Sequence, residues 1–295
     1  MKSVSPLRYP GGKTALAEAL RAILKLNDLE GCTIVEPFAG GGGASLALLF
    51  DGAVTNIVLN DLDTAVSSFW WAATHRHNQL RELIRMVPIT VAQWKKQRKR
   101  YRDETRSRFD RGFAAFYLNR CNRSGIIKNG GCIGGLEQTG DWALDARFNR
   151  TTLIERLDKV AEYRKHIRIR NRDACRVITV NKREKRFFFI DPPYYHKGQE
   201  LYLNSLDHDY HERLAVHLQA LNSMNWVVTY DDCPEIRKLY RDWANIRRYT
   251  LRYTAAVRRR AGEILISPKA LAIPKTASGL SVGRTKGSEL WVRTI

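Results

Sequence analysis

Short apolar runs alternate with helix-like stretches in the first quarter of the chain. Residues 32–36 form an apolar run that leads into Pro-Phe-Ala and four glycines, and residues 44–50 then have the composition of a helix. A second apolar run at 56–59 precedes another helix-like stretch at 63–75. Strand, glycine turn, helix and strand in this order predict the α/β class, with a parallel, doubly wound sheet.

The pattern changes between residues 76 and 165. Long helical stretches rich in Arg and Lys and a glycine-rich segment at 125–140 replace the strand-like runs. No alternation in this region is strong enough to extend the sheet. We therefore predict a discontinuous catalytic domain, residues 1–75 and 166–270, interrupted by a mainly helical insertion at 76–165.

Strand-like and helix-like runs resume after the insertion. The expected strands are at 167–170, 187–190 and 226–229, and the expected helices are at 208–222 and from Pro234 onward. Residues 246–254 and 262–266 alternate well enough to predict a hairpin. The basic tail, residues 271–295, has no assigned structure.

The composition adds a strong positive charge to this picture. Fifty Lys and Arg stand against thirty Asp and Glu, which gives a net charge of +20 and favours a polyanion, above all nucleic acid, as the partner. An anionic membrane could attract the same charge, but no apolar run approaches the roughly 20 residues of a spanning helix. The N-terminus also lacks the apolar stretch of a signal peptide. We expect a soluble, cytoplasmic protein that does not bind membranes.

The five cysteines follow no pattern typical of a disulfide framework or a zinc site. They are scattered and odd in number, with no Cys-x-x-Cys pair and no His at zinc-finger spacing. We therefore expect small, buried or half-buried free cysteines and no metal site.

Residues 36–43, Glu-Pro-Phe-Ala and four glycines, form the turn between the first predicted strand and its helix. Ligands of open parallel sheets bind at the carboxyl ends of the strands, and glycines let the backbone approach a ligand closely. Taken alone, the turn is weak evidence for ligand binding, because an ordinary structural loop is the more common explanation. A P-loop requires Gly-Lys followed by Ser or Thr after its glycines, and this sequence is absent here. The turn therefore favours a nucleoside without a triphosphate.

Two further segments suit a nucleoside ligand. Asp61 ends the second predicted strand, about 25 residues after Glu36, where a carboxylate can accept hydrogen bonds from ribose hydroxyls. A helix N-cap is the alternative role, for which Asp63 is the better candidate. At the N-terminus, Arg-Tyr-Pro-Gly-Gly-Lys could be a turn with a solvated lysine. In a binding role, Lys13 would pair with a carboxylate of the ligand, and the flat ring of Tyr9 would lie against the ligand.

The apolar run at 187–190 leads into a rigid turn that is rich in acceptors. The Asp191 carboxylate and the Pro192 carbonyl can each accept one hydrogen of a planar amine. Pro192 and Pro193 have a fixed φ and carry no N–H that would compete. Tyr194 can stack on the ring that bears the amine. An ordinary loop made by two prolines is the alternative, and we predict the amine pocket.

Four motifs occur in a fixed order along the chain. They are Arg-Tyr-Pro-Gly-Gly-Lys at 8–13, Val-Glu-Pro-Phe-Ala-Gly-Gly-Gly at 35–42, Leu-Asn-Asp at 59–61 and Asp-Pro-Pro-Tyr at 191–194. Their content and order resemble the Dam-like (D12 class, alpha-group) DNA adenine-N6 methyltransferases over most of residues 6–266. The resemblance implies a Rossmann-like class I S-adenosylmethionine-dependent methyltransferase sheet with an inserted target-recognition domain.

The resemblance further implies a site-specific DNA adenine methyltransferase. Such an enzyme transfers a methyl group in line from S-adenosyl-L-methionine to N6 of an adenine flipped out of double-stranded DNA. The positive charge that then builds on the amine would be stabilised by a carboxylate, with no need for a metal. The expected cofactor-binding residues are Tyr9, Lys13, Glu36, Phe38, Gly40, Gly42, Asp61 and Asp191. The expected catalytic residues are Asp191, Pro192, Pro193 and Tyr194.

Two basic segments are candidates for gripping DNA phosphates. Residues 94–108 hold eight basic and two acidic side chains, and the hairpin at 247–260 holds six Arg and no acid. A charge run is usually a solvated face, but the net charge and the base-flipping site favour DNA contacts here. The expected DNA-binding residues are Asn119, Arg120, Arg123, Ser124, Lys128, Arg258, Arg259 and Arg260.

Two other functions compete with DNA methylation. An RNA methyltransferase could use a related Pro-Pro-Tyr turn, and a DNA-binding module could have lost catalysis. The N-terminal lysine motif and the insertion favour DNA, and intact Lys13, Asp61 and Asp191 favour an enzyme. Residues 126–135 differ from the family members that read GATC, so no target sequence is predicted. We expect a monomer in a bacterial or phage-infected cell. The sequence leaves open whether the enzyme belongs to a restriction-modification system, is encoded by a phage or acts alone.

Overall fold

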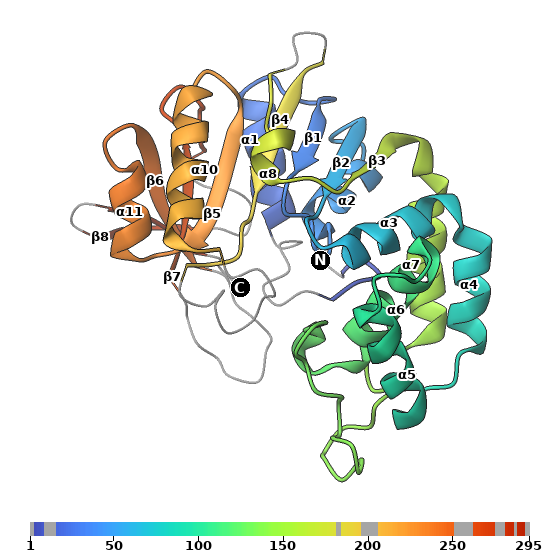
Figure 1. The fold of residues 1–295 in the computed structure, drawn as a ribbon. Helices are drawn as coiled ribbons and strands as arrows, with labels where there is room; N and C mark the ends of the chain where they lie inside the picture. The colour runs from blue at the N-terminus through green and yellow to red at the C-terminus, as the bar shows by residue number, and fades with distance from the viewer. Residues whose placement is uncertain are drawn as a thin grey trace.

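The computed structural model describes residues 3–8, 16–180, 184–195, 206–250, 262–274, 281–285 and 288–292 of the chain. These residues form a sheet flanked by helices and, beside it, a helical region that contains α4 to α7 (Figure 1). Among them, no helix combines the length and the apolar composition that crossing a membrane requires.

The described strands form one nine-stranded sheet in the order β3-β2-β1-β4-β5-β7-β6-β9-β8. The first five strands in this order are parallel: β3 (Ile167–Arg170), β2 (Asn56–Asn60), β1 (Thr33–Glu36), β4 (Arg186–Ile190) and β5 (Trp226–Asp231). Antiparallel β7 (Gly262–Pro268) lies between β5 and β6 (Ala244–Thr250). This arrangement confirms the predicted Rossmann-like α/β sheet and the strand pattern that led to it.

The basic tail adds two strands that the sequence pattern had not indicated. β9 (Ser288–Val292) runs parallel to β6, and β8 (Ser281–Thr285) pairs antiparallel with β9 at the edge of the sheet. Both strands are short and lack a clear apolar alternation: β8 reads Ser-Val-Gly-Arg-Thr and β9 reads Ser-Glu-Leu-Trp-Val. Part of the tail is therefore an extension of the catalytic sheet.

The central strands are buried on both faces, as expected for parallel strands covered by helices. Side chains of β4 alternate between two cores: Phe187 and Phe189 point to one core, and Phe188 and Ile190 to the other. The first core includes residues of α1 (Ala17–Leu26), α2 (Gly43–Phe50) and α3 (Thr64–His75). The second includes residues of α10 (His208–Ala220) and α11 (Pro234–Tyr240).

The predicted insertion follows α3 directly and returns to the sheet at β3. Its helices are α4 (His77–Met86), α5 (Val91–Arg102), α6 (Arg108–Cys121) and α7 (Arg150–Glu162). Phe116 of α6 stacks on Phe69 of α3 with ring centroids 5.5 Å apart, and a Cβ on Gly112 would lie 2.6 Å from the backbone of Ser68. Because α6 and α3 share one core, the division into separate domains stays a prediction.

Four of the five cysteines are buried, and Cys175 is half-buried, as expected for packing residues. Cys175 belongs to α8 (Ala174–Val177), the short helix that follows β3. Burial raises the pKa of Cys32 and Cys233 to about 11, so these thiols are protonated and unreactive at neutral pH.

Candidate active site

The glycine turn after β1 has a backbone that only glycine adopts without strain. Gly40 and Gly42 have φ values of 45° and 56°, and a Cβ on Gly42 would lie 3.2 Å from the Leu59 side chain. The indole nitrogen of Trp70, on α3, donates a hydrogen bond of 2.9 Å to the Gly40 carbonyl. The turn is therefore fixed in position at the carboxyl end of the sheet.

Asn60, a fully buried residue, ties together the turns that follow three neighbouring strands. Its amide nitrogen donates to the Pro37 carbonyl at 2.8 Å and to the Arg172 carbonyl at 2.9 Å. Its amide oxygen accepts from the Arg172 backbone N–H at 3.0 Å. The sequence analysis gave Asn60 no role, and its only signal was its place before Asp61 in Leu-Asn-Asp.

Asp61 lies directly beside the glycine turn. One carboxylate oxygen accepts the Gly40 N–H at 2.9 Å, and the other accepts the Asp63 N–H at 2.9 Å. Withdrawal from solvent is the main cause that raises the Asp61 pKa to about 7, and the charge of Asp63 adds to it. Asp63 caps α3 by accepting from Ala65 and Val66, which confirms it as the N-cap. The remaining lone pairs of Asp61 can accept from hydroxyl groups of a ligand.

Glu36 is a buried carboxyl group at the end of β1. Ser45, on α2, donates a hydrogen bond to it. Burial raises the Glu36 pKa to about 8, and the charges of Asp191 and Asp61 act in the same direction while the Ser45 hydroxyl opposes them. The structure therefore brings three predicted site residues from three strand ends close enough for their charges to interact.

These carboxylates form an anionic site that suits a cationic ligand. Among the described residues, no Lys or Arg lies within ion-pair distance of Glu36 or Asp61. Carboxylates that repel one another bind protons more tightly, and a bound cation relieves that repulsion. Phe38 lies half-buried at the same turn, with its ring edge against Tyr210 at 6.4 Å between centroids.

The Asp-Pro-Pro-Tyr turn is held in place by β5. The buried Thr229 hydroxyl donates a hydrogen bond to one Asp191 oxygen, and Asp231 accepts the Tyr195 N–H at 3.0 Å. Pro192 is buried, whereas Asp191, Pro193 and Tyr194 are half-buried and can face a ligand. Thr229 was missed by the sequence analysis, because its partner lies 38 residues earlier in the chain.

Two of the expected DNA-binding residues are framework residues in this structure. Asn119 is fully buried, and its amide accepts the Arg8 N–H at 2.7 Å and donates to the Gly125 carbonyl at 2.9 Å. Arg120 is also buried, and its Nε donates to the Arg147 carbonyl at 2.8 Å. Burial lowers the Arg120 pKa to about 9. Both side chains bond within the protein, and their contact with DNA stays a prediction.

The loop after α6 exposes the other expected contacts that the structure describes. Arg123, Ser124 and Lys128 are exposed, and the first two belong to the turn η2 (Arg123–Gly125). Asn122, fully buried beneath the loop, accepts from the Trp94 indole at 2.6 Å and donates to the Ile126 carbonyl at 2.6 Å. The loop thus has a rigid base and an exposed basic tip, and its contact with DNA stays a prediction.

Five expected site residues lie outside the described part of the chain. They are Tyr9 and Lys13 in the N-terminal motif and Arg258, Arg259 and Arg260 in the hairpin between β6 and β7. Their expected roles stay predictions.

A comparison with protein families places the chain in a known family. The model of the D12 class N6 adenine-specific DNA methyltransferases matches residues 9–255, well over half of the chain. The matched range contains the glycine turn, the helical insertion and the Asp-Pro-Pro-Tyr turn. A search of curated proteins finds no match.

Proposed function

The chain belongs to the D12 class of N6 adenine-specific DNA methyltransferases, and on this basis we propose that it methylates an adenine flipped out of double-stranded DNA, with S-adenosyl-L-methionine as donor. One observation carries the proposal: Asp191, at the end of β4, and Asp61, at the end of β2, both lie close enough to Glu36 for their charges to raise its pKa. A site for an amine therefore adjoins a site for a cationic nucleoside. Transfer of labelled methyl groups to duplex DNA tests it.

The anionic site fits this donor, because the sulfonium and ammonium groups of S-adenosyl-L-methionine are cationic. The bound donor supplies a methyl group on a good leaving group. Asp61 accepts hydrogen bonds from the ribose hydroxyls while its two backbone partners hold it in place. Glu36 lies on the amino acid side, where its ionised form attracts the ammonium group. Tyr9 and Lys13 complete the proposed site.

On the target side, Asp191 and the Pro192 carbonyl accept the two hydrogens of the adenine amine. This pair of acceptors orients the nitrogen lone pair toward the methyl group. As positive charge develops on the amine, the Asp191 carboxylate stabilises it more than it stabilised the neutral amine. Tyr194 stacks on the extruded base, which contributes about 1–3 kcal/mol and offsets part of the cost of unstacking.

Thr229 acts as a positioning residue for Asp191. Thr229→Val removes the hydroxyl that orients the carboxylate, and we expect kcat to fall roughly ten- to hundredfold, because hydrogen bonds to charged groups contribute about 1.5–3 kcal/mol. Thr229→Ser keeps the hydroxyl and should restore most of the rate. Single-turnover kinetics with duplex DNA measure the effect. An unchanged rate in the valine variant, or no recovery in the serine variant, would rule out this role.

Cofactor affinity should depend on pH through Glu36 and Asp61. Their raised pKa values, about 8 and about 7, mean that both carboxyls bind protons near neutral pH, and a cationic ligand must displace these protons. Affinity should therefore rise between pH 6 and pH 9, about tenfold for each unit by which the ligand lowers these pKa values.

Calorimetry in buffers of different ionisation enthalpy measures the protons released on binding. Methylthioadenosine is the matched control, because it lacks the ammonium group that Glu36 attracts, and its affinity should rise less with pH. Equal pH dependence for the two ligands would show that Glu36 does not face the ammonium group. Glu36→Gln should flatten the pH profile at its alkaline end, since it removes the group with the higher pKa.

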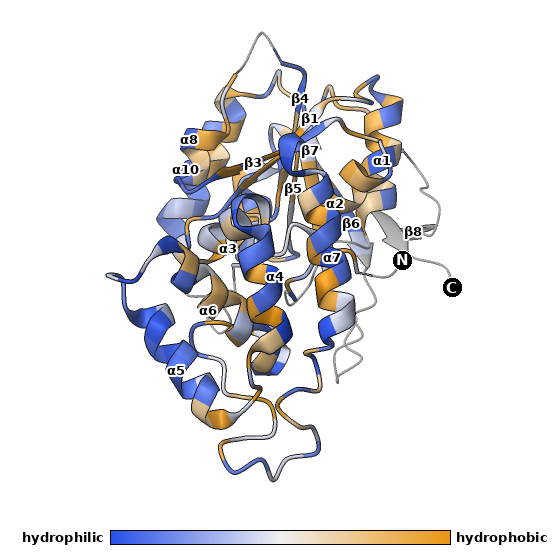
Figure 2. Ribbon diagram, turned by 90° about the vertical axis from the view of Figure 1, so that its right-hand side faces the viewer, coloured by the Kyte–Doolittle hydropathy of each residue, from blue (hydrophilic) through white to orange (hydrophobic). Residues whose placement is uncertain are grey.

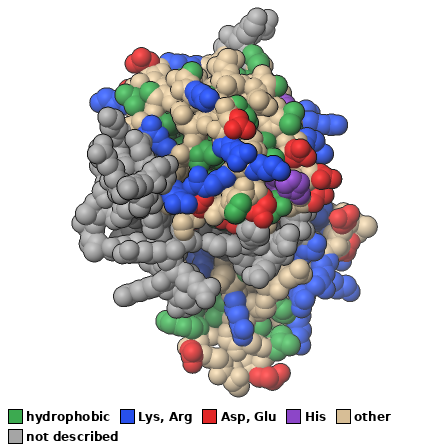
Figure 3. Space-filling view, turned by 90° about the vertical axis from the view of Figure 1, so that its left-hand side faces the viewer, with side chains coloured by type: hydrophobic (Ala, Val, Ile, Leu, Met, Phe, Trp, Pro, Cys, Tyr) green, Lys and Arg blue, Asp and Glu red, His purple; other side chains and the backbone are tan. Residues whose placement is uncertain are grey.

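We propose that α5 and the loop after α6 bind the DNA backbone. The sequence of α5 is hydrophilic along most of its length (Figure 2), with Trp94, Gln97 and Tyr101 buried and only basic charged side chains on the rest of the helix. On the opposite side of the molecule, around α10 and α11, basic and acidic side chains are mixed (Figure 3). The basic side chains of α5 have no acidic neighbours within the helix. The helix therefore suits a polyanion better than the mixed surface around α10 and α11 does.

A further inference from the structure

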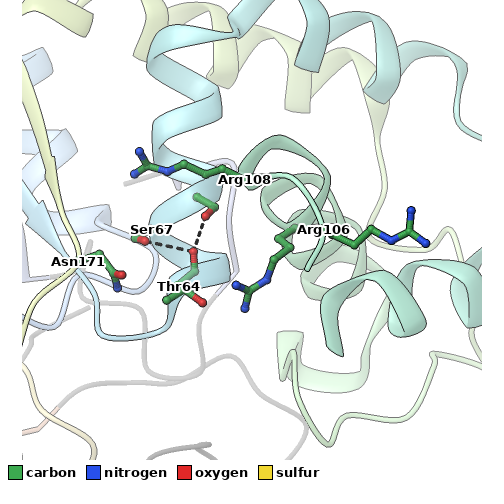
Figure 4. Close-up of a pocket in the computed structure, with 7 residues that line it drawn as sticks. Thr64, Ser67, Arg106, Arg108 and Asn171 are labelled. Carbon is green, nitrogen blue, oxygen red and sulfur yellow. Dashed lines mark hydrogen bonds between the residues drawn. The ribbon is translucent and has the colours of Figure 1, made fainter. Parts of the chain in front are cut away.

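A cavity of about 390 Å³ lies between the first turn of α3 and the segment that joins α5 to α6 (Figure 4). Its described lining consists of hydroxyl, amide and guanidinium groups without a carboxylate. These residues are Thr64, Ser67, Ser68, Arg106, Arg108, Arg111 and Asn171. The Asn171 amide donates to the carbonyls of Asp61 and Leu62, so the cavity adjoins the loop that carries Asp61.

Two of the three arginines have no acidic partner among the described residues. Arg106 pairs with Asp103 at 2.9 Å. Arg108 stacks on the Trp71 ring at 4.8 Å from its centroid, and burial lowers its pKa. The Nε of Arg111 is buried and has no hydrogen-bond partner. A buried donor without a partner is costly, so this atom marks where an acceptor is missing.

The two serine hydroxyls of the cavity are already engaged. Ser67 and Ser68 both donate to the Thr64 carbonyl, as the dashed lines in Figure 4 show. The guanidinium groups of Arg108 and Arg111 are therefore the charged donors that the cavity offers. Planar guanidinium groups suit phosphate, because two N–H groups can contact two oxygens at once.

The position of the cavity relative to the exposed loop indicates where such a phosphate lies. The cavity is at the start of α6, and the loop with Arg123 and Lys128 follows its end. A helix of 14 residues is about 21 Å long, which matches about six base pairs of duplex. Basic α5 packs beside α6, and Arg100 reaches Asp110 of α6 at 3.8 Å.

We propose that this cavity binds a single backbone phosphate of the DNA, in the flank several base pairs from the recognition loop. The inference rests on the proposed function, since it requires bound duplex. It assigns Arg108 and Arg111 to phosphate binding, apart from base recognition and from the cofactor. Contacts of this kind position the duplex and act equally on any flanking sequence.

The test compares the wild type with an Arg108→Ala/Arg111→Ala variant and with each single glutamine variant. Fluorescence anisotropy measures the duplex Kd across a salt series. We expect affinity to fall roughly tenfold and the slope of log Kd against log salt to fall by about one. Arg85→Ala on α4, where the side chain is 62% exposed, is the matched control and should change neither value. Thermal unfolding shows which variants are folded. If the double variant does not fold, the single glutamine variants decide the outcome.

Duplex length separates DNA from a free anion. Trimming one flank base pair by base pair should weaken wild-type binding at the length where the phosphate is lost, and the double variant should not respond to that step. An unchanged salt slope, or equal responses of both proteins to trimming, would overturn the inference. So would binding of inorganic phosphate without any response to trimming, because the cavity would then be a free-anion site. Weaker S-adenosyl-L-methionine binding with an unchanged salt slope would overturn it by assigning the cavity to the cofactor.

Methylation of DNA by the wild type is scored separately. If the wild type methylates duplex DNA while the arginine variants bind it normally, only the phosphate site fails. If the wild type does not methylate DNA, the proposed function itself fails.

Discussion

Asp191→Ala is expected to lower the methylation rate at least about a thousandfold while DNA binding stays nearly unchanged. The substitution removes both an acceptor for the adenine amine and the negative charge that stabilises positive charge in the transition state. The turn itself should persist, because Pro192 is buried and Asp231 still accepts the Tyr195 N–H. Single-turnover methylation and duplex anisotropy measure the two properties.

The matched control is Asp242→Ala, because it also removes an aspartate, but one whose side chain is 83% exposed. It should leave methylation and binding unchanged. Loss of both DNA binding and folding in Asp191→Ala would make Asp191 a structural residue, and a rate within tenfold of the wild type would exclude it from the chemistry. Asp191→Asn keeps an acceptor but loses the charge, so its methylation rate should lie between those of the wild type and Asp191→Ala.

Asp61→Ala should weaken S-adenosyl-L-methionine binding roughly a hundredfold. Each ribose hydroxyl that loses a charged acceptor costs about 1.5–3 kcal/mol. The same change removes the acceptor of the Gly40 N–H and so loosens the glycine turn. Calorimetric titration with the cofactor measures the loss, and duplex binding should be nearly unaffected because the Asp61 carboxylate bonds to Gly40 and Asp63 and has no role in the proposed DNA contacts.

Asp61→Asn separates the two contributions. It retains an oxygen that can accept the Gly40 N–H but loses the charge and one acceptor, so its affinity should lie between the wild type and the alanine variant. Cofactor binding within threefold of the wild type in Asp61→Ala would show that the ribose is held elsewhere.

The core of the sheet could be predicted because its central strands are buried on both faces and therefore apolar. The run at 187–190 fills two cores from alternate residues, so it stands out from the polar segments around it. The glycine turn and Asp61 were also predictable, since both end such runs. The tail strands were not, because β8 has a single apolar residue and the three apolar residues of β9 are consecutive, so neither strand alternates clearly.

The parts of the site that the sequence could not reveal are buried polar contacts between distant segments. Asn60 bonds to Arg172, 112 residues away, and Thr229 bonds to Asp191 from the neighbouring strand. Nothing in the local pattern selects these residues over other Asn or Thr residues. Asn119 shows the reverse case: a polar residue near a basic loop suggested DNA contact, but its partners, Arg8 and Gly125, place it in the interior.

The central claim concerns which atom receives the methyl group. Incubating the protein with tritiated S-adenosyl-L-methionine and either duplex DNA or RNA, followed by nuclease digestion and chromatography, identifies the labelled nucleoside. The site described here predicts N6-methyldeoxyadenosine from duplex DNA, none from the Asp191→Ala variant and none from RNA. Label found in N6-methyladenosine from RNA alone, or in a base other than adenine, would contradict it.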